Sequence, residues 1–248
     1  MKKVLEVCVD SLASARNAIA GGADRLELCS ALAVGGLTPY TALLKQIRRE
    51  SDIPIRCLMR HRPGDFFYTA DELELLREQI IELKQAEADG FVIGCLTPEG
   101  KLDKPAMKRL VQACGGNITL HRCIDVSADP ESTYLDAMDL GIDTVLTSGC
   151  ASSCLGGTEI IKKLIALRDS LNGPEVLIGA GVSASVIAQF RRDIPSARAF
   201  HMSGKINLPS GMVFRREGVP MGLPGLDEWN IQQTDKYAVA AARKALDE

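Results

Sequence analysis

Short apolar runs alternate with longer amphipathic segments along the whole chain, and this alternation predicts its architecture. Each short run is rich in aliphatic side chains, as buried strands are, and the segment after it has the helical spacing of apolar positions. The chain therefore divides into eight strand–helix units in unbroken order. Strands are expected over Val4–Asp10, Arg25–Ser30, Pro54–Arg60, Gly90–Leu96, Asn117–Ile124, Thr144–Ser148, Glu175–Gly179 and Ala197–Ser203, and the last helix over about Thr234–Leu246.

Strict alternation of strands and helices predicts a parallel sheet with right-handed crossovers. Eight such units in 248 residues match the closed (β/α)8 TIM barrel in both number and size. The alternative is a doubly wound open sheet, which usually has fewer strands and often a Gly-rich fingerprint after the first of them. Here the first strand ends in Asp10-Ser11, so we favour a single α/β barrel domain over residues 1–248.

One connection is too long for this pattern. The segment between Lys205 and Gln233 is rich in Pro and Gly and is far longer than an ordinary loop between strand and helix. It is either a functional flap or a disordered insert. Because it leaves the carboxyl end of the last strand, where barrels build their sites, we favour a flap whose Arg215 and Arg216 can reach the mouth.

Composition narrows the class of protein. A hydrophobic content of 46% supplies a large core, and a net charge of −3 lacks the basic excess typical of nucleic-acid binding. There is no apolar run of membrane-spanning length, and Met1-Lys2-Lys3-Val4 enters a strand directly, so we expect neither a signal peptide nor a membrane span. The eight cysteines lack the spacing of a disulfide framework, which indicates reduced thiols and a cytoplasmic location.

A four-residue motif that contains a glutamate and a cysteine occurs twice, at Leu5–Cys8 and at Leu26–Cys29. Residues two apart on a strand face the same side, so Glu6 and Cys8 point together, as do Glu27 and Cys29. Two neighbouring parallel strands would place both pairs in one interior. Paired soft thiolates suit Cu(I), although a buried free cysteine is also an ordinary small core residue.

Polar residues gather near the carboxyl ends of the predicted strands, the face where TIM barrels carry their sites. A buried carboxylate needs a cation or a proton nearby, and Arg60, Arg62 and Arg122 are the available partners for Glu6 and Glu27. The alternative is a network of ion pairs that only closes the top of the barrel.

Glycines follow the seventh and eighth strands, at Gly179–Ser183 and Ser203–Lys205. They either bind an anion through backbone N–H groups or simply permit tight turns. The candidates for acid–base chemistry are Glu6, Glu27, His121 and Asp125; those for substrate binding are Arg60, Arg62, Asp65, Arg122, Ser148, Gly181, His201, Ser203 and Arg215; and those for a metal are Cys8 and Cys29.

Six phrases of the sequence, taken together, are specific to one family. They are Glu6–Ser11, Gly21–Ser30, Gly35–Pro39, Gly64–Phe66, His121-Arg122 with Asp125, and Val145–Gly149. On these phrases the chain resembles the CutC family, the copper homeostasis proteins. The resemblance implies a (β/α)8 barrel, a cytoplasmic location, a homo-oligomer and Cu(I) binding by Cys8 and Cys29.

The chain departs from the family pattern in two loops. After the third strand the family commonly has Arg-Pro-Arg-Gly-Gly-Asp-Phe, where this chain has Arg60–Phe66 with His61 and Pro63 as replacements. After the fifth strand, His-Arg-Ala-Phe-Asp becomes His121–Asp125. The long connection keeps the family's Met-x-aromatic-Arg pattern up to Arg215, which supports that arginine as a site residue.

Three hypotheses follow from the sequence. The first is a copper-handling protein in which Cys8 and Cys29 hold one Cu(I). The second is an enzyme acting on a small phosphorylated or carboxylated metabolite, with the arginines binding the anion. The third is a structural scaffold whose mouth is closed by ion pairs. Metal and small anion could share the mouth, so the first two are compatible.

Overall fold

Eight parallel strands close into a barrel in the computed structural model, which describes residues 3–216, 218–223, 225 and 227–248. Each strand pairs with the next one in the sequence, and the eighth pairs with the first. The predicted (β/α)8 barrel is therefore confirmed, and the open sheet is ruled out. The strands are β1 (Val4–Val9), β2 (Arg25–Leu28), β3 (Ile55–Leu58), β4 (Gly90–Ile93), β5 (Ile118–Leu120), β6 (Thr144–Thr147), β7 (Glu175–Ile178) and β8 (Ala199–Met202).

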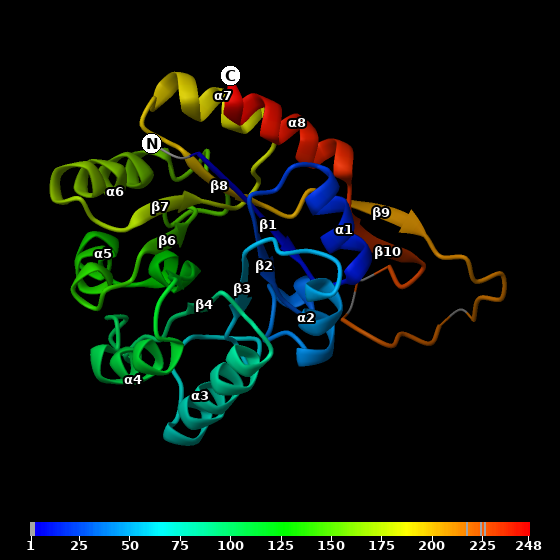
Figure 1. Ribbon diagram of the computed structural model, residues 1–248, viewed down its shortest axis with the longest axis horizontal. Helices are drawn as coiled ribbons and strands as arrows, with labels where there is room; N and C mark the ends of the chain where they lie inside the picture. The colour runs from blue at the N-terminus through cyan, green and yellow to red at the C-terminus, as the bar shows by residue number, and fades with distance from the viewer. Residues whose placement is uncertain (1–2, 217, 224, 226) are drawn as a thin grey trace.

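Helices surround the strands on the outside of the barrel (Figure 1). Side chains at their N-terminal ends accept hydrogen bonds from backbone N–H groups that the helix leaves unpaired. Ser11, Asp103 and Asp129 do so for three helices, and Thr69 forms a reciprocal capping box with Glu72. The helices are α1 (Leu12–Ala20), α2 (Thr41–Arg48), α3 (Ala70–Gln85), α4 (Lys104–Cys114), α5 (Pro130–Asp139), α6 (Thr158–Leu171), α7 (Ala184–Asp193) and α8 (Lys236–Asp247), with 3-10 turns η1 (Leu32–Val34) and η2 (Arg122–Val126).

Alternation along each strand separates two environments. On β1, Leu5 and Val7 face the helices and belong to the main apolar core, whereas Glu6 and Cys8 face the barrel interior. On β2, Leu26 and Leu28 face the helices, whereas Glu27 and the following Cys29 face the barrel interior. This confirms the alternation predicted from the sequence. Four further cysteines are buried in the main apolar core: Cys57, Cys95, Cys114 and Cys123.

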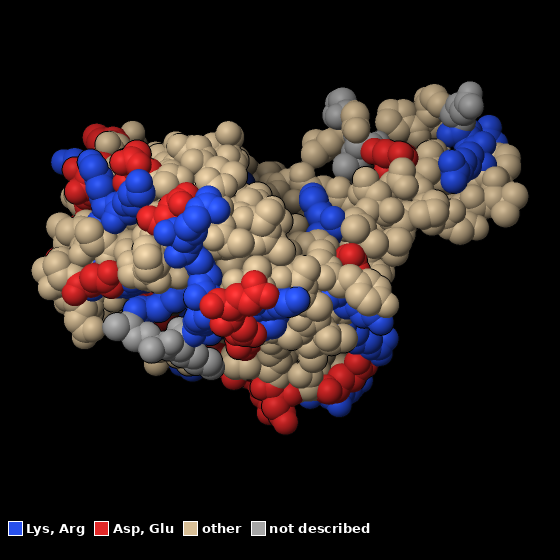
Figure 2. All heavy atoms as spheres, turned by 90° about the horizontal axis from the view of Figure 1, so that it is seen from above, with Lys and Arg blue, Asp and Glu red and all other residues tan. Residues whose placement is uncertain are grey.

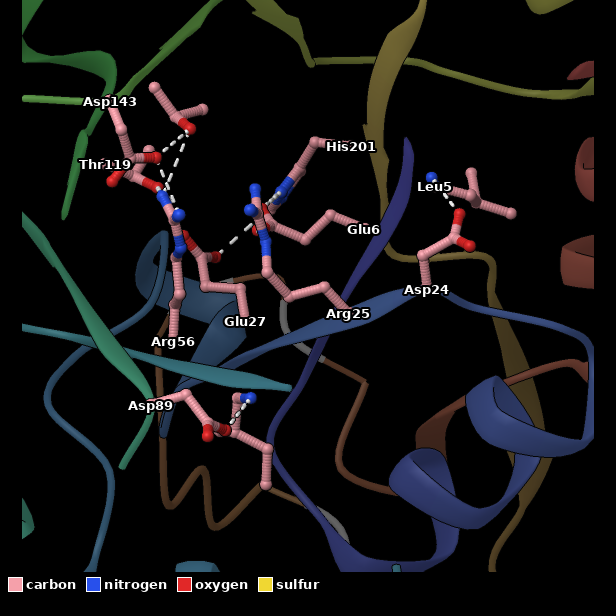
Figure 3. Close-up of polar contacts among 12 residues, drawn as sticks. Leu5, Glu6, Asp24, Arg25, Glu27, Arg56, Asp89, Thr119, Asp143 and His201 are labelled. Atoms are coloured by element: carbon pink, nitrogen blue, oxygen red, sulfur yellow. Dashed lines mark hydrogen bonds and ion pairs between the residues drawn. The ribbon is translucent and has the colours of Figure 1, made fainter. Parts of the chain in front are cut away.

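A hydrogen-bonded arginine ties three elements together at the amino end of the barrel. The guanidinium of Arg56 on β3 donates to the hydroxyl groups of Thr119 (2.7 Å) and Thr144 (3.1 Å) and pairs with the carboxylate of Asp143 at 2.6 Å (Figure 3). Buried polar groups persist where such partners satisfy them. The amino end of the barrel therefore has a structural role.

After β8 the chain forms an antiparallel hairpin, β9 (Lys205–Pro209) and β10 (Asn230–Thr234), which with its connecting segment we call the arm. The arm stands out from the body of the molecule in Figures 1 and 2. Within it, residues 217, 224 and 226 lie outside the described residues. Strand pairing makes this segment a hairpin directed outward from the barrel (Figure 1), rather than the flap that was expected to reach the mouth. Lys205, at the base of the hairpin, lines the cavity described below.

The last helix begins later than expected. Thr234 ends β10, with its N–H bonded to the Ser14 hydroxyl at 3.1 Å, and α8 starts at Lys236 after its cap, Asp235. Pairing between distant strands thus overrides the local helical pattern at this junction. In the described part of the chain, every helix falls short of the length and apolar character that a membrane crossing requires.

Candidate functional site

The carboxyl end of the barrel surrounds an open cavity of about 310 Å³. At about 30 Å³ per water in the liquid, this volume corresponds to roughly ten water-sized groups. The wall combines apolar side chains with groups from β1, β2, β8 and the loops after β3, β5 and β7. The structure brings these sequence-predicted residues together in it: Cys8, Glu27, Arg60, His121, Arg122, Gly181, His201 and Ser203.

Three metal-binding donor types meet in the wall of this cavity. One ligand atom each from Cys8, Glu27 and His201 lies within 4.8 Å of the other two. The barrel register produces this cluster, because β1 lies between β2 and β8 and Cys8 is the direct pairing partner of Glu27. A thiolate, a carboxylate and an imidazole nitrogen all ligate transition metals.

A carboxylate in the barrel interior orients the histidine. Glu6 is fully buried, and its two oxygens contact His201 Nδ1 at 2.8 Å and Arg25 Nε at 2.5 Å (Figure 3). Burial alone would raise the pKa of Glu6, but the Arg25 guanidinium and the His201 contact lower it to about 2. Glu6 is therefore ionised and accepts from Nδ1–H, which leaves Nε2 of His201 for the cavity side, 3.8 Å from Glu27.

The arginine that pairs with Glu6 is not one of those predicted from the sequence. The arginines predicted to neutralise it, Arg60, Arg62 and Arg122, lie beyond the carboxyl ends of their strands, whereas Arg25 sits directly beside Glu6 in the β1–β2 register. The sequence did carry a signal for Arg25. It precedes Glu27 by two positions, so it faces the same interior.

Cys29 is more completely buried than Cys8. Its thiol is fully buried and donates to Oε2 of Glu27 over 3.4 Å. Burial and the Glu27 charge raise the pKa of Cys29 well above its usual value, and burial also raises the pKa of Glu27. Cys29 belongs to the same interior cluster as Cys8, but the donor group at the cavity consists of Cys8 with Glu27 and His201.

His121 stands at the end of β5, across the barrel from β1. Its Nδ1 accepts from the Cys123 backbone N–H at 3.1 Å, so the neutral ring carries its proton on Nε2, which is buried and has no partner among the described residues. Gly94 on the neighbouring chain segment leaves room for the ring, because a Cβ there would lie 2.5 Å from His121 Cε1. Burial and the charge of Arg60 lower the pKa of His121 to about 3.

We expect the imidazole of His121 to stay neutral throughout the physiological pH range. Between its folded pKa of about 3 and the unfolded value of about 6.5, the unfolded chain binds a proton that the folded chain does not. The titration of His121 therefore leaves the free energy of unfolding unchanged above about pH 6.5 and lowers it as the pH falls below that value. An NMR titration of the ring checks this, and a resonance midpoint between pH 6 and 7 would contradict it.

Two candidate residues fasten a loop next to the cavity. The Asp125 carboxylate accepts hydrogen bonds from the Thr147 hydroxyl at 2.5 Å, from Ser148 N at 2.9 Å and from Arg122 Nε at 2.7 Å. Arg122 also donates to the Ser148 hydroxyl at 2.7 Å. Asp125 and Ser148 thereby hold the start of the loop after β6 in place, and of this group only Arg122 lines the cavity.

The remaining candidates lie away from the cavity. Arg62 pairs with Glu72 at 2.6 Å and with Asp65 at 3.1 Å, and Asp65 is largely exposed. Arg215 lies on the arm, where its guanidinium stacks over the Trp229 ring at 5.2 Å. The structure therefore does not bring Arg62, Asp65 or Arg215 to the site.

Comparison with known proteins gives consistent matches. The model of the CutC family matches residues 3–206. The family protein CutC of Vibrio campbellii is 39% identical over 249 residues, covering 99% of this chain and 100% of that protein. The human copper homeostasis protein cutC homolog is 38% identical over 94% of this chain and 85% of its own length. The solved structure of CutC from Streptococcus agalactiae, 26% identical, has a TM-score of 0.75 and covers 81% of this chain and 98% of that one.

Proposed function

Because this chain belongs to the CutC family of copper homeostasis proteins, we propose that it binds a copper ion at Cys8, Glu27 and His201. The observation that carries the proposal is the convergence of these three donor groups within 4.8 Å in the wall of an open cavity. Copper is the cargo in this proposal, and the open side of the cavity is its route of entry and exit.

The donor set fits Cu(I). A thiolate is the soft ligand that selects this ion, and an imidazole nitrogen also suits copper, so Cys8 and His201 form the main pair with Glu27 as a third donor. Glu6 holds His201 by its Nδ1–H, as outer-shell carboxylates do for metal-binding histidines. Cys29 supports the site through its hydrogen bond to Glu27.

We expect X-ray absorption of the protein loaded anaerobically with one equivalent of Cu(I) to show one sulfur ligand together with nitrogen or oxygen ligands. The reason is that one thiol, Cys8, belongs to the donor group. Two sulfur ligands would instead support the paired site of Cys8 and Cys29. An unbound ion, removed by a weak chelator, would overturn copper binding altogether.

A further inference from the structure

Cys8 and His201, together with Glu6, also resemble a different kind of site: a thiol nucleophile, a base and a carboxylate that orients the base. His201 lies between Cys8 and Glu6. One ring nitrogen is 2.8 Å from Glu6, and a nitrogen of the ring lies within 4.8 Å of the Cys8 sulfur. Nucleophile, base and a third group that fixes the base are the parts that covalent catalysis by cysteine requires.

The orienting carboxylate is itself fixed. Arg25 contacts the second oxygen of Glu6 at 2.5 Å (Figure 3), and Glu6 is fully buried. The imidazole plane is therefore set by two strands, β1 and β8, rather than by a loop. Rigid strands position a reacting constellation more closely than loops do.

The thiol faces a space in which a small molecule fits. Cys8 lines the open cavity of about 310 Å³, together with apolar side chains such as Leu32, Leu58 and Leu146. The same wall carries the cationic Arg60 and Lys205. This combination suits a compound of roughly ten non-hydrogen atoms that has a short acyl group and an anionic end.

We propose that the metal-free protein transfers and hydrolyses small anionic acyl compounds through Cys8. His201 takes the thiol proton, the sulfur attacks the acyl carbonyl carbon, the bond from that carbon to the leaving group breaks, and the proton passes from His201 to the leaving group. Water then attacks the thioester, His201 receives the proton of that water and returns it to the sulfur, and a carboxylic acid leaves. No oxidant or further reactant is needed.

This activity goes beyond copper binding and does not depend on it. Copper and the acyl group would compete for the same sulfur atom, so one equivalent of bound Cu(I) should block acyl transfer. The two proposals can therefore fail separately.

Acetyl phosphate is a suitable probe, because it is small, anionic and carries an activated acetyl group. Metal-free protein is incubated with it, phosphate release is measured, and the acetylated residue is located by peptide mass spectrometry. We expect the acetyl group on Cys8, and phosphate release that falls about 100-fold or more in Cys8→Ala and in His201→Gln. Cys150→Ser, which removes the exposed thiol outside the cavity, is the matched control and should change nothing.

Acetylation of Cys150 instead of Cys8 would overturn the proposal, as would equal phosphate release by wild type and His201→Gln. Circular dichroism shows whether each variant folds. If His201→Gln does not, Cys8→Ala decides, and phosphate release by Cys8→Ala equal to that of wild type overturns the proposal. Unchanged acetylation of Cys8 in protein loaded with one equivalent of Cu(I) would instead count against copper at Cys8. Acetyl transfer by a protein that fails to bind copper would support this activity and refute the proposed function.

Discussion

Replacing Cys8 by serine should reduce the affinity for Cu(I) by more than about 100-fold, whereas Cys29→Ser should keep it within about 10-fold of wild type. Loss of an outer-shell partner typically costs 10- to 100-fold in metal affinity, and loss of a direct thiolate ligand should exceed that range. Cys8 is in the donor group at the cavity, and Cys29 only donates a hydrogen bond to Glu27, which a serine hydroxyl can also donate.

A competition titration with a Cu(I) chelator, performed anaerobically, measures both affinities. Cys150→Ser is the control, because this thiol is exposed and lies outside the cavity wall. Equal losses in the two variants would mean that both thiols ligate the ion, and would move the site from the cavity wall toward the interior cluster of Cys8 and Cys29.

Arg25→Met should lower the free energy of unfolding by about 3–5 kcal/mol. Removing one partner of a buried ion pair leaves the other charge uncompensated, and Glu6 is fully buried. The matched control is Arg16→Met, whose ion pair with Glu50 is exposed and should contribute little to stability.

Urea unfolding of the two variants compares them directly. A second substitution, Glu6→Gln in the Arg25→Met background, removes the uncompensated carboxylate charge and should recover part of the lost free energy of unfolding. A change below about 1 kcal/mol for Arg25→Met would show that Glu6 finds sufficient compensation from His201 alone.

The sequence was sufficient to predict the barrel but not the alignment of its strands. Alternation placed Glu6, Cys8, Glu27 and Cys29 in one interior, as observed. It could not say which residue of β2 stands beside Cys8, because neighbouring strands of a barrel are staggered. That stagger pairs Cys8 with Glu27 rather than with Cys29, which is why the site proposed above has a mixed donor set.

Other differences between the prediction and the structure have the same cause, because they depend on contacts between residues far apart in the sequence. His201 was a candidate for substrate binding, and only the β1–β8 pairing reveals that it lies beside Glu6. The hairpin of the arm was missed because β9 and β10 are short, exposed and separated by a long stretch of chain, so no local pattern indicated that they pair. Arg215 was assigned to the mouth on a local motif, which carries no information about the direction of the arm.

The arm leaves and rejoins the barrel at a single point, which makes it separable from the rest of the protein. Asp235 N donates to Gly204 O at 2.8 Å, so the ends of the insertion are clamped whatever lies between them. Doubling the length of a flexible loop costs only about 0.6 kcal/mol once its ends are fixed. The family model also stops at residue 206, where the arm begins. Evolution can therefore lengthen, trim or exchange this module while the barrel stays intact.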